Sequence, residues 1–159
     1  MTIHRMLESG GELFWFKGAL INIRVSWIAG EDRVSVVEHF MPYGMSPPLH
    51  VHRNEDEVFH ILEGSMRIQV DGVESIAHAG QTVMAPKGVP HSFRVESAEG
   101  ARCLTITTGG DLERMIREIG EPADSTRLAQ RYEPGEAVSP ALAQCCARNG
   151  IDLVGAPLS

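Results

Sequence analysis

Three histidines and one glutamate in the middle of the chain have residue types and spacing that suit a single metal ion. They are His50, His52, Glu57 and His91. Side chains alternate along a strand, so His50 and His52 would point to one face, and Glu57 and His91 would return to that face from neighbouring segments. Imidazole and carboxylate ligands suit Fe, Mn, Ni, Co, Cu or Zn, with one or two positions left open for substrate, water or O2. The pattern therefore predicts one divalent transition metal ion as cofactor.

Glycines and a proline frame these residues in two blocks. The first reads G-x5-H-x-H-x4-E-x6-G from Gly44 to Gly64, and the second reads G-x5-P-x-G-x2-H from Gly80 to His91. Together they resemble the two signature motifs of the cupin superfamily, with the short spacing common in its small bacterial single-domain members. One position departs: Val95 stands where the family usually has an asparagine four residues after the histidine. That asparagine is not a ligand in the family, so the metal prediction is unaffected.

Short apolar or alternating runs, separated by Gly, Pro, Asp and Asn, fill the chain from residue 12 to residue 108. Such runs favour an all-β sandwich or barrel, because no helix-period segment interrupts them to form βαβ units. With the motif resemblance, we expect a cupin-type jelly-roll barrel. The pair Asp71-Gly72 predicts a tight type I′ hairpin. The expected strands are Glu12–Phe16, Ala19–Trp27, Arg33–Met41, Pro48–His52, Val58–Leu62, Ser65–Val70, Val73–His78, Gln81–Ala85, His91–Val95 and Arg102–Thr107.

The composition changes after Thr108, where the pattern predicts a short helical tail. A first helix is expected to begin at an Asp111 cap and to end near Ile119. A second helix is expected to follow a Ser139 cap and to stop at Gly150, with a proline at its first position. The polar stretch between them, Ala123 to Glu136, is expected to be a surface linker.

Size and charge narrow the kind of protein. At 159 residues we expect one domain, with residues 1–108 as the barrel and its N-terminal strands, and residues 109–159 as a helical extension packed on it. Fourteen basic against 21 acidic residues give a net charge of −7, so nucleic acid is not an expected partner. No stretch approaches roughly eighteen consecutive apolar residues, and the start lacks a signal-peptide pattern. We therefore expect a cytoplasmic protein without a membrane partner, whose cysteines, Cys103, Cys145 and Cys146, are reduced and packed.

Strand alternation also predicts which side chains would surround the ion. If Glu57 points inward, every second residue along its strand should also point inward. The same applies to the residues that face them on the next strand of the hairpin, and to the residue two positions after His91. An apolar pocket around a charged centre suits a flat or hydrophobic organic substrate that presents an oxygen pair to the ion. Each of these residues is also compatible with plain barrel core. The predicted pocket residues are Phe59, Ile61, Met66, Ile68 and Phe93.

The other histidines carry no metal-binding spacing. His60 has the opposite parity to Glu57, so we expect it to face outward or toward an interface. His4, His39 and His78 are expected to be ordinary surface or hydrogen-bonded residues, which is what most single histidines are.

Beyond the motifs, a looser resemblance points to an activity. The strand start FWFKG, the segment PPLHVHRNEDEVFHILEG and the helical tail resemble the small bacterial cupins grouped as quercetin 2,3-dioxygenase-like. In that group the matching glutamate takes a proton from the substrate, which gives Glu57 a predicted catalytic role beside its role as a ligand. The resemblance implies a metal-dependent dioxygenase that uses O2 on an aromatic or enolisable small molecule. A metal-dependent isomerase, lyase or cyclase, or a small-molecule-binding cupin without turnover, remains open, because one fold hosts all of these.

The sequence also bears on assembly. An open jelly roll leaves strand edges with unpaired backbone groups. The apolar runs Leu13–Phe16 and Ala19–Trp27 could cover the sheet of a neighbouring copy. We therefore predict a homodimer.

Overall fold

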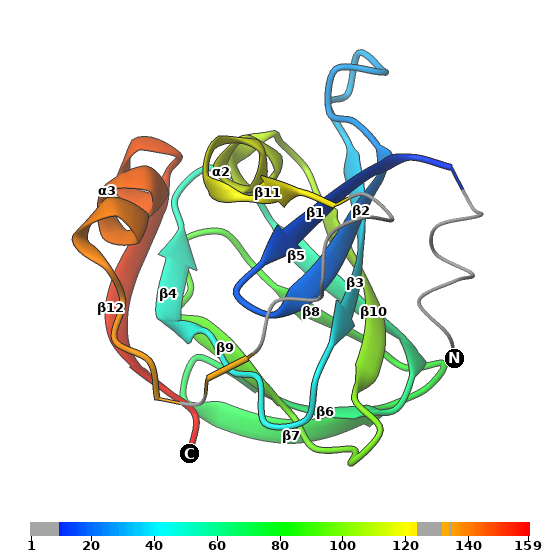
Figure 1. Ribbon diagram of the computed structural model, residues 1–159, viewed down its shortest axis with the longest axis vertical. Coiled ribbons are helices and arrows are strands. Elements are labelled where there is room, and N and C mark those ends of the chain that lie inside the picture. Colours follow the sequence, from blue (N-terminus) through cyan, green and yellow to red (C-terminus); the bar gives the residue numbers. More distant parts are fainter. Residues whose placement is uncertain (1–9, 124–131, 134) are drawn as a thin grey trace.

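Two antiparallel sheets form the walls of a jelly-roll barrel (Figure 1). The structure, a computed structural model, describes residues 10–123, 132–133 and 135–159. The larger sheet has the order β11-β1-β2-β3-β10-β5-β8, and the smaller has the order β12-β4-β9-β6-β7, where β11 is Glu121–Pro122 and β12 is Ile151–Pro157. The first ten strands are β1 (Glu12–Phe16), β2 (Ala19–Val25), β3 (Ser35–Met41), β4 (Pro48–His52), β5 (Glu57–Glu63), β6 (Ser65–Val70), β7 (Val73–His78), β8 (Thr82–Ala85), β9 (His91–Val95) and β10 (Ala101–Thr107).

The strand ends follow the turn chemistry of the sequence. All ten predicted strands are present, with ends within two residues of the predicted ones. In the hairpin between β6 and β7, Val70 pairs with Val73 across the turn. Asp71 and Gly72 both have positive φ, 51° and 75°, as a type I′ turn requires. The predicted all-β jelly-roll fold is therefore confirmed.

Strands from both sheets carry the candidate ligands to the space between them. In the smaller sheet, His50 on β4 lies in register with His91 on β9. His52 ends β4, and its carbonyl oxygen accepts a hydrogen bond of 2.8 Å from the backbone N–H of Gly88, in the turn that leads to β9. Glu57 begins β5 in the larger sheet. The four residues therefore meet because two sheets face each other, although three of them are close in sequence.

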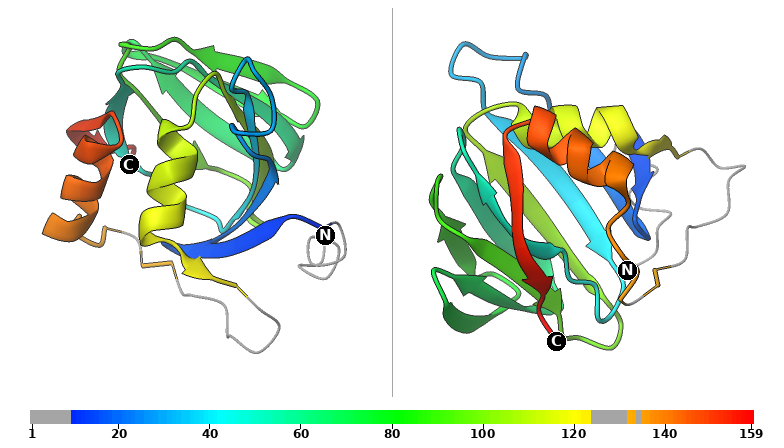
Figure 2. Two further views of the ribbon diagram at one scale, coloured as in Figure 1. Left: turned by 90° about the horizontal axis from the view of Figure 1, so that it is seen from above. Right: turned by 90° about the vertical axis from the view of Figure 1, so that its left-hand side faces the viewer.

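Two helices, α2 (Asp111–Ile119) and α3 (Pro140–Arg148), lie side by side over one end of the barrel (Figures 1 and 2). Ser139 caps α3 as predicted, because its Oγ accepts a hydrogen bond of 3.2 Å from the backbone N–H of Leu142. Within the described residues, neither helix is long and apolar enough to cross a membrane. The predicted linker at 123–136 falls largely outside the described residues.

The start of α2 differs from the prediction. Asp111 is the first helical residue, and Gly110 occupies the cap position without a side-chain hydrogen bond. The buried carboxylate of Glu55 takes over the capping role, because it accepts hydrogen bonds from the backbone N–H groups of Asp111 (3.1 Å) and Leu112 (2.7 Å). Sequence reasoning missed this arrangement because the capping residue lies more than fifty positions upstream of the helix.

The C-terminal segment contains a strand that sequence reasoning also missed. β12 (Ile151–Pro157) follows α3 and pairs antiparallel with β4, with Leu153 opposite His50. Gly150 allows the reversal between α3 and β12: its φ is 74°, and a Cβ there would lie 2.3 Å from a carboxylate oxygen of Asp111. A two-residue strand, β11 (Glu121–Pro122), lines the edge of β1. The extension beyond residue 108 is therefore not only helical, since it completes the smaller sheet beside the candidate ligands.

The N-terminal runs belong to the chain's own sheet. β1 and β2 pair with each other, and Leu20 and Ile21 are each 1% exposed. Phe14, Ile21 and Ile23 belong to the main core cluster, and Leu20 packs with Trp15 in a second one. Most apolar side chains of these runs are therefore covered by the chain itself, with Val25 an exposed exception, so the runs lend the homodimer prediction little support.

The homodimer stays a prediction, and the exposed edges of the two sheets support it better than the N-terminal runs do. β7 and β8 each end a sheet, and Ile76 and Met84 on them are more than half exposed. Edge strands with exposed apolar residues favour pairing with another copy. Light scattering at micromolar concentration is expected to give twice the mass of one chain, and Ile76→Lys is expected to shift the distribution toward one chain. A wild-type mass of one chain would reject the prediction.

Candidate metal centre

The four predicted ligands meet in one cluster. Each of His50, His52, Glu57 and His91 offers one ligand atom, and these atoms all lie within 4.8 Å of one another. The Oε2 atom of Glu57 lies 2.8 Å from Nε2 of His91 and 3.3 Å from Nε2 of His52. The ring centroids of His50 and His91 are 4.4 Å apart. The spacing in the sequence thus brings these groups to one point in the fold.

Hydrogen bonds on the far side of each ring fix how the imidazoles face. The Nδ1 atom of His50 lies 2.7 Å from the carbonyl oxygen of Pro48, and that of His91 lies 2.9 Å from the carbonyl oxygen of Val89. A carbonyl can only accept, so both Nδ1 atoms carry the proton and donate. The Nδ1 atom of His52 lies 3.0 Å from Oε1 of Glu55. All three rings therefore present Nε2 toward the cluster, as metal-binding histidines do when their other nitrogen has a partner.

Burial and neighbouring charges set the protonation of the cluster. Burial would raise the pKa of the Glu57 carboxyl, but the charge of His52 and the hydrogen bond with His91 outweigh it and lower that pKa to about 2. Burial, reinforced by His91, lowers the pKa of His50 to about 4. Burial would also lower the pKa of His52, but the carboxylates of Glu57 and Glu55 raise it. At neutral pH Glu57 is ionised and His50 is neutral, which are the forms that bind a metal cation.

This donor set fits a transition metal ion. Three imidazole nitrogens and one carboxylate oxygen, all buried or nearly so, converge with their outer hydrogen bonds already made. Both ring nitrogens of His91 face oxygen atoms: Nδ1 the carbonyl of Val89 and Nε2 the carboxylate of Glu57. Such a set suits first-row transition metals rather than Mg or Ca, which prefer oxygen ligands.

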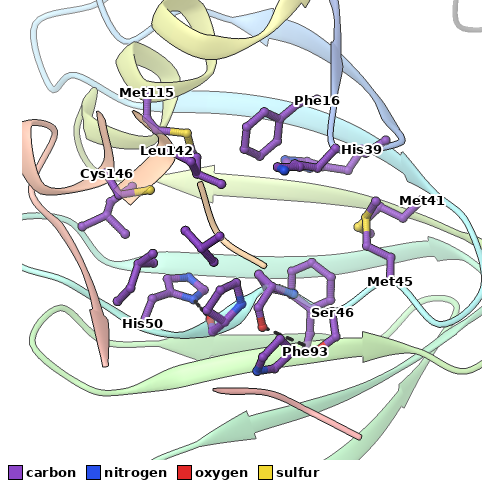
Figure 3. A pocket seen from close by; sticks show the side chains of 18 of the residues that line it. Phe16, His39, Met41, Met45, Ser46, His50, Phe93, Met115, Leu142 and Cys146 are labelled. Carbon is purple, nitrogen blue, oxygen red and sulfur yellow. Dashed lines mark hydrogen bonds between the residues drawn. The ribbon is translucent and has the colours of Figure 1, made fainter. Parts of the chain in front are cut away.

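A cavity of about 190 Å³ adjoins the cluster. His39 and Phe16 lie on one wall, and His50 and Phe93 lie on the facing wall (Figure 3). The lining is mainly apolar, as is usual for small-molecule sites. The cluster therefore opens onto a space that a small organic molecule can enter.

The helices contribute to the wall of this cavity. Met115 of α2 and Leu142 and Cys146 of α3 line it (Figure 3). All three cysteines are buried and free, as predicted, and burial raises the pKa of the Cys146 thiol to about 11. The predicted extension beyond residue 108 therefore forms part of the candidate site, a role that sequence reasoning did not assign to it.

The predicted pocket residues divide into two groups. Phe93 lines the cavity. Phe59, Ile61, Met66 and Ile68 are at most 2% exposed and belong to the main core cluster instead of the described cavity lining. Their inward parity is correct, but parity does not tell how deep in the barrel a residue lies. Phe59 supports the site, since its ring meets that of His91 edge-on at 6.2 Å. Contact of any of the five with a substrate stays a prediction.

His39 is the residue whose role sequence reasoning missed. It lines the cavity from β3, and its Nε2 atom is buried without a hydrogen-bond partner among the described residues. The expectation of an ordinary surface or hydrogen-bonded histidine is therefore wrong. The signal was its parity, because His39 alternates with Val37 and Met41, which are both buried. His60, in contrast, is hydrogen-bonded to Thr82 on the neighbouring strand, away from the cluster.

Glu55 is expected to support both the metal site and α2. Glu55→Ala should weaken metal binding by about tenfold to a hundredfold, because His52 loses the partner that fixes its ring. It should also lower the melting temperature, because the N–H groups at the start of α2 lose their buried acceptor. Metal titration and thermal melting measure the two effects, with the exposed Glu31→Ala as control. Wild-type metal affinity in Glu55→Ala would show that Glu55 does not orient His52.

Comparison with known proteins supports the fold. Residues 36–107 match the cupin domain family. Quercetin 2,3-dioxygenase of Bacillus subtilis (strain 168) is 28% identical over 120 residues, which cover 75% of this chain and 35% of that enzyme. The chain thus spans about a third of the length of this curated relative.

Solved structures show the same fold. A cupin domain from Schizosaccharomyces pombe superposes with a TM-score of 0.55 at 19% identity, covering 76% of this chain and 82% of that one. A variant of oxalate decarboxylase from Bacillus subtilis gives a TM-score of 0.56 at 23% identity, covering 64% of this chain and 28% of that one. Residues 36–107 therefore match a cupin domain, and the chain as a whole has the jelly-roll fold.

Proposed function

We propose that this cupin is a metal-dependent dioxygenase that acts on an aromatic or enolisable small molecule. The observation that carries the proposal is the convergence of three imidazoles and one carboxylate on the wall of an apolar cavity. Four protein ligands leave one or two positions of a transition metal ion open. The 28% identity to quercetin 2,3-dioxygenase over 120 residues supports this activity among those that cupins carry out.

The residues of the chain would divide the work as follows. His50, His52, His91 and Glu57 would hold the ion, which would supply Lewis-acid and redox chemistry toward O2. Glu57, ionised at neutral pH, is the one carboxylate of the cluster and would accept a proton from a substrate hydroxyl or an acidic C–H. The apolar lining would exclude water and hold the carbon skeleton of the substrate beside the cluster.

Oxygen uptake tests the proposal. Protein reconstituted with Fe, Mn, Co or Ni is expected to consume O2 with at least one member of a panel of flavonols, catechols and β-diketones, and not to consume it after metal removal. The same preparations are assayed for metal-dependent isomerase, lyase or cyclase turnover. Turnover in those assays with no O2 uptake for any pairing would replace the dioxygenase with a Lewis-acid enzyme. Substrate binding without turnover in any assay would leave a binding protein.

A further inference from the structure

One buried polar atom on the cavity wall has no hydrogen-bond partner within the described part of the chain. The Nε2 atom of His39 is buried and makes no hydrogen bond with the described residues, although its ring lines the cavity. Buried polar groups in native proteins are nearly always satisfied, so an exception calls for a partner that the chain itself does not supply. Figure 3 shows the His39 ring pointing from β3 into the cavity beside Phe16, on the wall that faces His50.

Other polar groups around the cavity already have partners. The Tyr132 hydroxyl donates to the carbonyl oxygen of Gly44 at 3.1 Å. The Ser46 hydroxyl accepts from the backbone N–H of Leu158 at 2.9 Å. Lys17 forms an ion pair of 3.2 Å with Glu136. His39 therefore differs from these three wall residues, because its buried Nε2 atom has no hydrogen-bond partner among the described residues.

The protonation of His39 limits what it can bind. Burial lowers its pKa to about 4, although the negative charge of Glu57 acts in the opposite direction. The ring is therefore neutral at neutral pH, with one nitrogen that donates and one that accepts. A neutral imidazole in an apolar wall suits an uncharged hydroxyl or carbonyl group better than a carboxylate or phosphate, whose burial costs more.

The size of the cavity limits the rest of the ligand. Its volume of about 190 Å³ is below the roughly 300–1,000 Å³ of sites for drug-sized molecules. The candidate ligands His50, His52 and Glu57 line the cavity, and His39 lies on the wall that faces His50. A matching molecule is compact, with polar groups at both ends and an apolar middle.

We propose that His39 is a specificity-determining residue that hydrogen-bonds an uncharged hydroxyl or carbonyl at the end of the substrate remote from the metal-binding oxygens. The substrate class is then a compact molecule of one or two rings, with an enolisable oxygen pair at one end and this second polar group at the other. The inference rests on the proposed function, since the oxygen pair is assigned to the metal centre.

Binding measurements test this role without relying on turnover. The ligands are 3-hydroxy-4-pyranone chelators that carry an alkyl arm of one to three carbons on the far side of the ring, each with and without a terminal hydroxyl. Affinities are measured by calorimetry on zinc-loaded protein, because zinc does no redox chemistry. For at least one arm length, the wild type is expected to bind the hydroxylated ligand about fivefold to tenfold more tightly, as one neutral hydrogen bond implies.

Variants of His39 assign that preference to its ring. His39→Phe keeps an aromatic ring and is expected to bind both ligands of the pair equally, with unchanged zinc content. His39→Gln keeps a donor and an acceptor and is expected to retain part of the preference, so it covers the case in which His39→Phe does not fold. The matched control is His78→Phe, an exposed position on β7 outside the described cavity lining, which should keep the wild-type ratio.

The outcomes separate this inference from the proposed function. Tight binding of the chelators with no hydroxyl preference at any arm length, or a preference that survives in His39→Phe, would overturn the role of His39 and leave the metal centre in place. A preference that His39→Phe abolishes would support the role even if no O2 uptake were found. Failure of zinc-loaded protein to bind any of the chelators would overturn the role of His39, while the O2-uptake assay would still decide the proposed function.

Discussion

Replacing any one of His50, His52 or His91 by alanine is expected to remove most of the bound metal while the barrel still folds. Each variant loses one of four ligands, so metal affinity should fall by at least about a hundredfold, more than the loss of an outer hydrogen-bond partner causes. The fold should survive because the apolar side chains of the main core cluster, which hold the two sheets together, are unchanged in all three variants. Elemental analysis after dialysis measures the metal, and circular dichroism reports the fold.

His60→Ala is the matched control for these variants. His60 lies on β5, three residues from Glu57, and its ring is hydrogen-bonded to Thr82 at 2.9 Å instead of facing the cluster. It should retain full metal content. If the three cluster variants kept wild-type metal levels, these histidines would not be ligands and the ion would have to bind elsewhere.

The parts of the fold that could be predicted from the sequence depend on local patterns. Strand runs and turn residues act over a few positions, and the Asp71-Gly72 turn and the Ser139 cap both appear as predicted. Part of the ligand cluster also follows from a local pattern, because His50 and His52 lie two positions apart on one strand and share a face. His91 is more distant in sequence, yet the fixed motif spacing places it in register with His50.

The parts that could not be predicted depend on packing between distant segments. The cap of α2 comes from Glu55, and one cavity wall comes from Met115 and Leu142 on helices that follow the barrel in sequence. No short-range sequence pattern predicts which end of the barrel the C-terminal helices will cover. Parity separates inward from outward residues but not core from cavity, which is why Phe59 packs in the core and His39 reaches the cavity.

Val95 departs from the cupin motif, but the fold keeps the same arrangement of strands without the usual residue. It stands where the second cupin motif usually has an asparagine, and its side chain is fully buried in the core cluster. Its backbone N–H donates to the carbonyl oxygen of Met45 at 2.9 Å, and its carbonyl oxygen accepts from Gly44 at 3.0 Å. Backbone hydrogen bonds thus tie β9 to the segment before β4, so the register of His91 with His50 does not need the asparagine side chain.

Glu57→Gln should separate the two roles proposed for Glu57, because it is expected to lose turnover much more severely than metal. Glutamine keeps a carbonyl oxygen at the same position, so it can still ligate, although without the charge. It cannot accept a proton, and a positioned general base contributes about a hundredfold to ten-thousandfold to rate. Burial would raise the pKa of the wild-type carboxyl, but the neighbouring imidazoles lower it to about 2, so Glu57 is ionised at neutral pH and the substitution removes this proton acceptor.

Metal content and O2 uptake, measured on the same preparations of Glu57→Gln, test this separation. We expect metal content to fall by no more than about tenfold at limiting metal and to recover at saturating metal, as loss of ligand charge implies. O2 uptake per bound metal ion should stay at least about a hundredfold below wild type even at saturation. Glu63→Gln, at the partly exposed end of the same strand, controls for the loss of a carboxylate on β5. If uptake per metal ion recovered at saturation, Glu57 would act only as a ligand, and the proton would have to leave the substrate by another route.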